Sequence, residues 1–324
     1  MSVPNIIFDT DMGNDVDDAL AQLLLHSFVQ SGDAEFCAEV VNKGNRLAPA
    51  FVDMLNRFYG RNDIDVGWCA DGPTPEEGRF LRSVLEKGRG LLPYAPDLKE
   101  WPDAVSLLRR HLTVIPDQSG VYVSIGFSTI LARLLESAPD EYSDLNGIEL
   151  VARKLNFISI MAGNFDPGVM KNPCPENVEA NIRHDISSAA RAFRLCPVPM
   201  VFSGFEVGSQ CCFPREAVKY EMDWCSFHPV KRAYELYNGI EHDRPLWDLT
   251  SLLVAVFPDK GYFGLSEPGT VVVQDDGHVL FEPSPDGLHQ YLILDPEKIP
   301  ELVEIFRDRC TQPFGEAKDV CSGI

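Results

Sequence analysis

The sequence predicts an α/β protein with an open, mainly parallel sheet flanked by helices, followed by a C-terminal β-hairpin. Two observations carry this prediction. Short apolar segments alternate with longer amphipathic segments along most of the 324 residues, and the alternation stops near Gly269, where β-rich segments follow one another. Strands and helices that alternate along a chain are joined by right-handed crossovers, which make the strands parallel. Hydrophobic residues form 45% of the chain, so a sizeable core is available.

The segments that resemble buried strands are short, apolar and rich in β-branched or aromatic residues. We expect strands at residues 5–8, 36–41, 121–125, 156–161 and 199–203. Between them apolar residues recur at helical spacing, and we expect helices at residues 49–59, 76–87, 104–112 and 129–136. No repeat, low-complexity segment or clear linker interrupts the pattern, so the sequence predicts a single domain over residues 1–324.

The pattern changes after Gly269. Residues 271–273 and 279–281 are rich in β-branched residues, and the turn between them contains Asp276 and Gly277. An Asp-Gly pair suits the tight turn of a β-hairpin. We also expect a further strand at residues 291–294 and a closing helix at residues 296–310.

Five aspartates lie within ten residues directly after the first expected strand: Asp9, Asp11, Asp15, Asp17 and Asp18. An apolar helix is expected to follow at once, so the acids occupy a strand-to-helix turn. In an open α/β sheet this is the carboxyl edge of a strand, where ligands bind. Five carboxylates in one turn repel one another, and the positive end of a helix relieves only part of that repulsion. A bound divalent cation is the simplest remedy.

The donor atoms in this turn are all oxygens, which favours a hard ion such as Ca²⁺ or Mg²⁺ over zinc. Two other interpretations remain open. Asp9-Thr10-Asp11 resembles the DxD of haloacid-dehalogenase-type phosphatases, in which the first acid attacks phosphate, although the acids Asp17 and Asp18 follow too closely for that family. The acids would otherwise serve only as a helix cap and a solvated turn.

The charge of the chain restricts the partners that it can bind. The formal net charge of −21 argues against a nucleic acid polymer, because the phosphate backbone would be repelled. A small neutral or weakly charged substrate fits better. There is no apolar run of membrane-spanning length and no basic and apolar leader after Met1, so we expect no membrane partner and a cytoplasmic location.

A second candidate element lies far along the chain. Asp248 follows Trp247 at the head of an otherwise apolar segment that we expect to be helical. Asp248 alone is a plausible helix N-cap. Together with the N-terminal aspartates, it suggests an acid delivered to the same edge of the sheet.

With these elements the chain resembles the inosine-uridine preferring nucleoside hydrolases over nearly its whole length. Residues 9–19 resemble the family's DxDxGxDDA signature, with two extra residues after Gly13. Three further segments resemble the family's GPLTNLA turn, its E-F-N element and its HD pair; they are residues 125–132, 179–181 and 247–248. The resemblance implies a nucleoside hydrolase-like, Rossmann-like fold. It also implies an enzyme that hydrolyses the N-glycosidic bond of ribonucleosides to release nucleobase and ribose.

The resemblance further implies a cofactor and a catalytic base. It implies a Ca²⁺ ion held by Asp11, Asp18, Asp248 and the backbone carbonyl of Thr129. Asp11 would remove a proton from a water molecule held by that ion, because water is a weak nucleophile at neutral pH.

The ribose contacts implied by the resemblance come from several parts of the chain. Asp17, Asn181 and Asp248 would grip the ribose hydroxyls, and Glu179 would lie near the 5′-hydroxyl. A site built to hydrogen-bond these hydroxyls leaves its own groups unpaired when one is missing, so we expect selectivity for ribose over deoxyribose.

Three assignments in this ribose site stay open. Asn45 and Asn172 resemble the family's other ribose-facing amides, and Asn42 competes with Asn45 for that role. The two extra residues after Gly13 also leave a choice, because Asp15 takes the ribose role of Asp17 if the loop bulges late.

The group that helps the nucleobase leave is not evident from the sequence. Trp247 stands where the resemblance implies a histidine, and an indole stacks on a base but cannot protonate it at neutral pH. His228 and His184 are the candidates for a general acid. The replacement also keeps open a catalytically silent nucleoside- or ribose-binding protein. The family forms dimers and tetramers, so the resemblance implies a homodimer or homotetramer.

Overall fold

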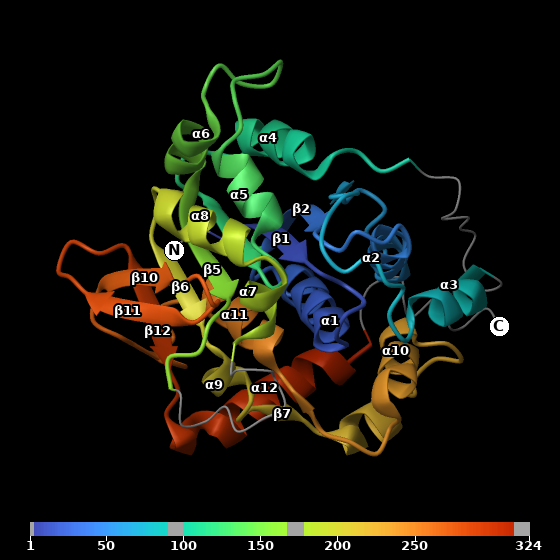
Figure 1. Cartoon of the computed structure of the whole chain (residues 1–324). Coiled ribbons are helices and arrows are strands. Elements are labelled where there is room, and N and C mark those ends of the chain that lie inside the picture. The colour runs from blue at the N-terminus through green and yellow to red at the C-terminus, as the bar shows by residue number, and fades with distance from the viewer. Residues whose placement is uncertain (1–2, 90–99, 167–177, 314–324) are drawn as a thin grey trace.

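A ten-stranded sheet organises the computed structural model, which describes residues 3–89, 100–166 and 178–313 (Figure 1). Consecutive parallel neighbours form most of it, in the order β3-β2-β1-β4-β5-β6-β12. Their bounds are β1 Asn5–Thr10, β2 Glu35–Val41, β3 Val66–Trp68, β4 Gly120–Ser124, β5 Leu155–Met161, β6 Met200–Ser203 and β12 His289–Ile293. This confirms the open, mainly parallel sheet that the sequence predicts.

The C-terminal hairpin is also confirmed. Strands β10 (Gly269–Val273) and β11 (Val279–Pro283) pair antiparallel, with Val271 opposite Phe281, and they extend the sheet beyond β12. Gly277 in the connecting turn has a φ of 88°, which an L-residue with a side chain rarely adopts. A short strand, β9 (Gly264–Leu265), pairs antiparallel with β12.

Helices cover both faces of the sheet because side chains alternate along each strand. On β1, Ile6 and Phe8 enter one hydrophobic core while Ile7 enters the other. The first core contains side chains from α1 Asp17–Gln30, α2 Leu47–Phe58, α3 Leu81–Arg89, α10 Pro229–Asn238, α11 Trp247–Val256 and α12 Ile299–Thr311. The second contains side chains from α4 Ala104–Val114, α5 Thr129–Leu135, α6 Gly147–Lys154 and α8 Ile186–Leu195.

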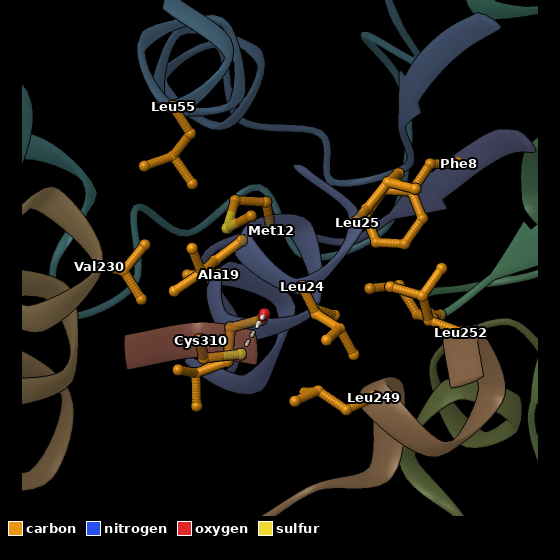
Figure 2. Close-up of a cluster of buried hydrophobic side chains, with 14 of the residues drawn as sticks. Phe8, Met12, Ala19, Leu24, Leu25, Leu55, Val230, Leu249, Leu252 and Cys310 are labelled. Atoms are coloured by element: carbon orange, nitrogen blue, oxygen red, sulfur yellow. Dashed lines mark hydrogen bonds between the residues drawn. The ribbon is translucent and has the colours of Figure 1, made fainter. Parts of the chain in front are cut away.

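Helix α1 is almost completely enclosed in the first core. Every residue from its start to Phe28 is buried, as expected for a helix that is apolar on nearly all sides. It packs against α11 and α12, and Figure 2 shows Leu24, Leu249 and Cys310 in the surrounding cluster. The head of α1, which carries the paired aspartates, is therefore held rigidly.

The strand order creates a crevice between β1 and β4. From β1 the chain first builds β2 and β3 on one side and then returns to place β4 on the other side. The connections after β1 and β4 thus leave in opposite directions, and ligands bind at such a switch point in open α/β sheets. The two segments approach closely there, since a Cβ atom on Gly126 would lie 2.5 Å from the amide nitrogen of Asp11.

Some element predictions needed correction. Strand β1 runs two residues further than expected, to Thr10, so Asp9 belongs to the strand and not to the turn. Helix α3 begins at Leu81 rather than at residue 76, because Gly78 before it has a φ of 78°, which no α-helix accommodates. Asp248 is not an N-cap: the cap residue of α11 is Leu246, and Asp248 lies in the first turn.

Several smaller elements lay outside the expected segments. They are α7 Ala180–His184, α9 Phe205–Gly208, a π-helical turn at Ala217–Glu221 and the separate pair β7 Cys212–Phe213 and β8 Arg244–Pro245. The helix expected at residues 296–310 begins as a 3-10 turn at Pro296–Lys298. None of the helices in the described parts of the chain combines the length and apolarity that a membrane crossing requires. The single-domain organisation of residues 1–324 stays a prediction.

Candidate active site

A cavity of about 460 Å³ opens at the carboxyl edge of β1, β4 and β5. Aspartates of the strand-to-helix turn line one part of it, and aromatic side chains line another. A larger cavity of about 680 Å³ lies at the opposite edge of the sheet, around Val121 and Phe157. The smaller cavity contains the convergent polar groups that mark a ligand site, so it is the candidate active site.

Three carboxylates meet in this cavity. One side-chain oxygen from each of Asp17, Asp18 and Asp248 lies within 4.8 Å of the other two. Asp17 and Asp18 come from the first turn of α1, and Asp248 comes from the first turn of α11, so the positive ends of two helices face the group. The apolar faces of both helices fix this meeting point, because α1 and α11 pack against each other.

The electrostatics of this carboxylate group are unfavourable without a counter-charge. Burial raises the pKa of Asp17, Asp18 and Asp248 well above the usual range, and repulsion among neighbouring aspartates raises each pKa further. A bound cation would offset this repulsion and favour the ionised carboxylates. Its donor atoms are all carboxylate oxygens, which fits a hard divalent ion.

Asp11 lies beside the carboxylate group but has different neighbours. Its Oδ2 accepts a hydrogen bond of 2.6 Å from Asn14, whose Oδ1 accepts one of 2.6 Å from the Nζ of the buried Lys43. Burial raises the pKa of Asp11, while Asn14 and Lys43 both act to lower it. The predicted ligand set contained Asp11, Asp18 and Asp248, whereas in the structure Asp17 is the third member of the close group.

The remaining aspartates of the turn do other work. Asp9 is completely buried outside the cavity, where its carboxylate accepts hydrogen bonds from Asn42 and, at 2.7 Å, from the hydroxyl of Tyr122. Asp15 forms an ion pair with Arg244. Asp17 and Asp18 adjoin the helix, and Asp15 lines the same cavity, so the ribose role of Asp17 in preference to Asp15 stays a prediction.

Helix α7 brings Glu179 and Asn181 to the cavity. Glu179 caps the helix and accepts backbone hydrogen bonds of 2.7 to 3.3 Å from Gly163, Asn181 and Ile182. Burial nevertheless raises its pKa to about 7. The side-chain amide of Asn181 donates to the backbone carbonyls of Ile125 and Met161, which leaves its own oxygen to accept from a ligand.

Other predicted site residues are not brought to the cavity. Asn45 lies against a different cavity beside Arg82 and donates to the carbonyl of Pro75, so the structure does not place it among the ribose contacts. Its competitor Asn42 is buried and ties Asp9 to the β4–α5 connection. Asn172 lies outside the described residues.

Thr129 also lies differently from the prediction. It begins α5, and its hydroxyl donates a 2.6 Å hydrogen bond to Asp185. The residue of the β4–α5 connection that lines the cavity is Ile125. The contact of the Thr129 carbonyl with a cation stays a prediction.

Aromatic side chains form the wall opposite the α7 residues. Trp247 stacks on Phe205 with ring centroids 5.4 Å apart, and its indole nitrogen donates to the carbonyl of Phe205. A Cβ atom on Gly208 would lie 2.3 Å from the Cα of Trp247, so glycine is required there. Tyr237 and Arg244 complete this wall. A flat heterocycle fits such a surface.

The two candidate histidines differ in their position relative to the cavity. His228 is buried in an aromatic cluster away from the cavity, where it caps α10, and burial lowers its pKa to about 3. It is a structural residue. His184 lines the cavity, and burial lowers its pKa as well, so the neutral imidazole is favoured at neutral pH.

Four residues of this site were missed from the sequence: Asn14, Lys43, Tyr237 and Arg244. Asn14 stands inside the aspartate turn, and Arg244 stands four residues before Asp248, so proximity to the motifs was the available signal. Lys43 and Tyr237 carried no such signal, because only the fold brings them to the turn.

The fold and the site define an α/β protein with a carboxylate site for a cation, placed beside an aromatic wall at the switch point of the sheet. A model of the family described as inosine-uridine preferring nucleoside hydrolase matches residues 6–288, and the chain belongs to that family. No curated protein sequence matches the chain.

Solved structures of nucleoside hydrolases share the fold along nearly the full length. A purine-preferring ribonucleoside hydrolase from Gardnerella vaginalis has a TM-score of 0.73 at 19% identity, covering 97% of this chain and 99% of the other. A plant nucleoside hydrolase has a TM-score of 0.66 at 20% identity, covering 96% of this chain and 99% of the other. The inosine-uridine preferring nucleoside hydrolase from Bacillus anthracis has a TM-score of 0.67 at 17% identity, covering 95% of this chain and 100% of the other. The chain is thus an enzyme of the nucleoside hydrolase class, an N-glycosidase acting on ribonucleosides.

Proposed function

We propose that this chain uses a bound Ca²⁺ ion to hydrolyse the N-glycosidic bond of ribonucleosides, with Asp11 as the general base. The observation that carries the proposal is the meeting of Asp17, Asp18 and Asp248 in a cavity that also has an aromatic wall. A cation bound there would position water and lower its pKa. Asp18 and Asp248 belong both to the ligand set that the sequence implies and to the group of three neighbouring carboxylates. We therefore propose these two residues as ligands of the cation.

Asp11 is suited to accept a proton. It is buried next to the carboxylate group, and its hydrogen bond from Asn14 orients one oxygen of the carboxylate. Lys43 lies behind Asn14 and stabilises the ionised form of Asp11. An ionised carboxylate at this position can take a proton from water as the water attacks C1′.

The ribose is bound through its hydroxyls. Asp17 and Asp248 supply acceptors on one side of the cavity, and the free oxygen of Asn181 supplies one on the other. Glu179 lies at the end of the cavity that we assign to the 5′-hydroxyl. The surrounding anions also stabilise the positive charge that develops on the ribosyl group as the bond breaks.

The two alternatives are less well supported. A phosphatase of the DxD type needs Asp9 as its nucleophile, but Asp9 is buried outside the cavity and is held by Tyr122 and Asn42. A catalytically silent binding protein would keep the ribose contacts and lack a base, whereas Asp11 is present beside the carboxylate group.

The test is a substrate panel with matched variants. Inosine, uridine, their 2′-deoxy forms and p-nitrophenyl phosphate are assayed with Ca²⁺ and after chelation. We expect turnover of the ribonucleosides alone, lost on chelation, and discrimination against 2′-deoxy forms of about 10⁴-fold. Asp11→Asn should lower kcat by about 10²- to 10⁴-fold. The control is Asp71→Asn, whose exposed carboxylate pairs with Arg133 away from the cavity.

Distinct results would contradict the proposal. Ribonucleoside turnover that survives both chelation and Asp11→Asn would exclude the proposed chemistry. Phosphate release would favour the phosphatase, and tight binding without turnover would favour the silent binder. We also expect a homodimer or homotetramer and a cytoplasmic location, which light scattering and cell fractionation can check.

A further inference from the structure

We propose that Arg244 stabilises the departing nucleobase through its positive charge. The inference rests on the proposed function, because it concerns the leaving group of the same reaction. It starts from two residues that cannot act as the general acid: Trp247 cannot donate a proton at neutral pH, and His228 is buried away from the cavity. His184 is the competing candidate, and the test includes it.

The position of Arg244 carries the proposal. Arg244 lies on β8, three residues before Trp247, and lines the same cavity. Its guanidinium carbon lies 5.1 Å from the ring centroid of Trp247 and 4.9 Å from that of Tyr237. The guanidinium therefore lies over the faces of both rings, and a base that enters the cavity beside Trp247 meets a cation there. The side chain of Arg244 is only 14% exposed, so solvent screens this charge weakly.

Among the described residues, the guanidinium of Arg244 is bound through Nη2. Its Nη2 donates to Oδ2 of Asp15, which also accepts from the hydroxyl of Tyr237 at 3.1 Å. Its Nε is buried and has no hydrogen-bond partner within residues 3–89, 100–166 and 178–313. Asp15 thus holds the guanidinium by one edge and acts as a positioning residue. Ring nitrogens and carbonyl oxygens of a nucleobase are acceptors, and an arginine fork suits them.

The step balances without a protein acid. The water oxygen forms a bond to C1′ and gives one proton to Asp11, while the bond from C1′ to the base nitrogen breaks and its electron pair goes to the base. The base leaves as an anion paired with Arg244 and then takes a proton from solvent. Asp11 returns its proton to solvent, so the net reaction consumes one water.

The experiment compares leaving groups in one protein. Inosine and uridine carry poor leaving groups, whereas p-nitrophenyl β-D-ribofuranoside releases a stable phenolate that needs little stabilisation. Arg244→Gln should lower kcat/KM for both nucleosides by about 10²-fold, as loss of a charge-stabilising donor does. For the phenolate substrate the change should stay within about threefold. Arg244→Lys should recover most of the loss, because it restores the charge.

Two further variants make the comparison specific. Arg215→Gln is the matched control, since Arg215 pairs with Asp243 near the same strand but does not line the cavity. His184→Gln tests the competitor. The ratio of the two substrates within one variant does not depend on how much of the protein is folded.

Three outcomes would overturn the inference. The first is an equal decrease of kcat/KM for both kinds of substrate in Arg244→Gln, which would make Arg244 a structural residue. The second is unchanged nucleoside turnover in Arg244→Gln. The third is a selective loss of nucleoside turnover in His184→Gln instead. Failure of the proposed function looks different, because the unaltered enzyme would then hydrolyse neither the nucleosides nor the phenolate substrate.

Discussion

Two buried polar groups lie against helix α1, and they differ in the number of acids that they contain. The first is the carboxylate group of Asp17, Asp18 and Asp248. The second, which we call the Glu39 cluster, consists of Glu39, Gln22, Asn56 and His26. Both are enclosed by the protein, so burial by itself does not distinguish function from structure.

The partners of the acids make the difference. In the Glu39 cluster one carboxyl accepts from Gln22 and Asn56 at 3.1 and 2.8 Å, and burial raises the pKa of Glu39 to about 8. His26 is neutral because burial lowers its pKa to about 3. A single acid can stay protonated among neutral amides. Three acids facing one cavity leave a concentration of negative charge that a cation can neutralise.

Replacing one acid of each group with its amide should give the largest difference in kcat/KM between the two groups. Asp18→Asn removes a proposed cation ligand, and we expect kcat/KM for ribonucleosides to fall by roughly 10³-fold, since a catalytic metal contributes several kcal/mol. Glu39→Gln should leave kcat/KM near that of the unaltered enzyme. Steady-state kinetics with inosine checks both variants, and equal losses would show that the two groups do not differ in function.

The Glu39 cluster should make the free energy of unfolding depend on pH. The pKa of Glu39 is about 8 in the folded protein and 4.5 in the unfolded chain. Between these values the unfolded chain has released the proton and the folded protein retains it, so this group's contribution is complete below pH 4.5 and is lost as the pH rises through 8. The decrease is on the order of a few kcal/mol.

Urea titrations between pH 5 and 9 measure this effect. Glu39→Gln cannot titrate, so its free energy of unfolding should fall less over that range than that of the unaltered protein. Parallel curves for the two proteins would contradict a protonated Glu39. Asp71→Asn serves as the control, because that aspartate is exposed and pairs with Arg133.

Cation binding should stabilise the folded protein through the group of Asp17, Asp18 and Asp248 and not through the Glu39 cluster. Adding Ca²⁺ to chelator-treated protein should raise the free energy of unfolding by about 2.7 kcal/mol at a concentration 100 times the Kd. Thermal denaturation with and without Ca²⁺ measures this stabilisation. The increase should vanish in Asp248→Asn and persist in Glu39→Gln. A Ca²⁺ effect that survives in Asp248→Asn would place the cation elsewhere.

Asp9 provides the comparison with the smallest expected effect, because it lies on β1 only two residues before Asp11. Tyr122→Phe removes a hydrogen bond to the buried carboxylate of Asp9, and we expect the protein to lose about 1–3 kcal/mol of stability. The kcat for inosine should change little, since Asp9 does not line the cavity. A large loss of kcat in the folded variant would give Asp9 a catalytic role.

Much of the fold followed from local pattern. Apolar segments of strand length predicted β2, β4, β5 and β6 nearly to the residue, and the Asp-Gly turn predicted the hairpin of β10 and β11. Elements with weak local signals escaped, among them the three-residue β3 and the short α7. Short elements depend on tertiary contacts, so periodicity cannot reveal them.

The sequence by itself determined the family, the parallel sheet and the acids of the site, because these depend on residue type and spacing along the chain. Only the tertiary structure divided the five N-terminal aspartates among buried anchor, ion pair and cavity. It also brought Lys43, Tyr237 and Arg244 to the turn and moved Asn45 away from it. The physical reason is that a carboxylate's role depends on which donors and charges surround it, and those neighbours come from strands and helices far away in the chain.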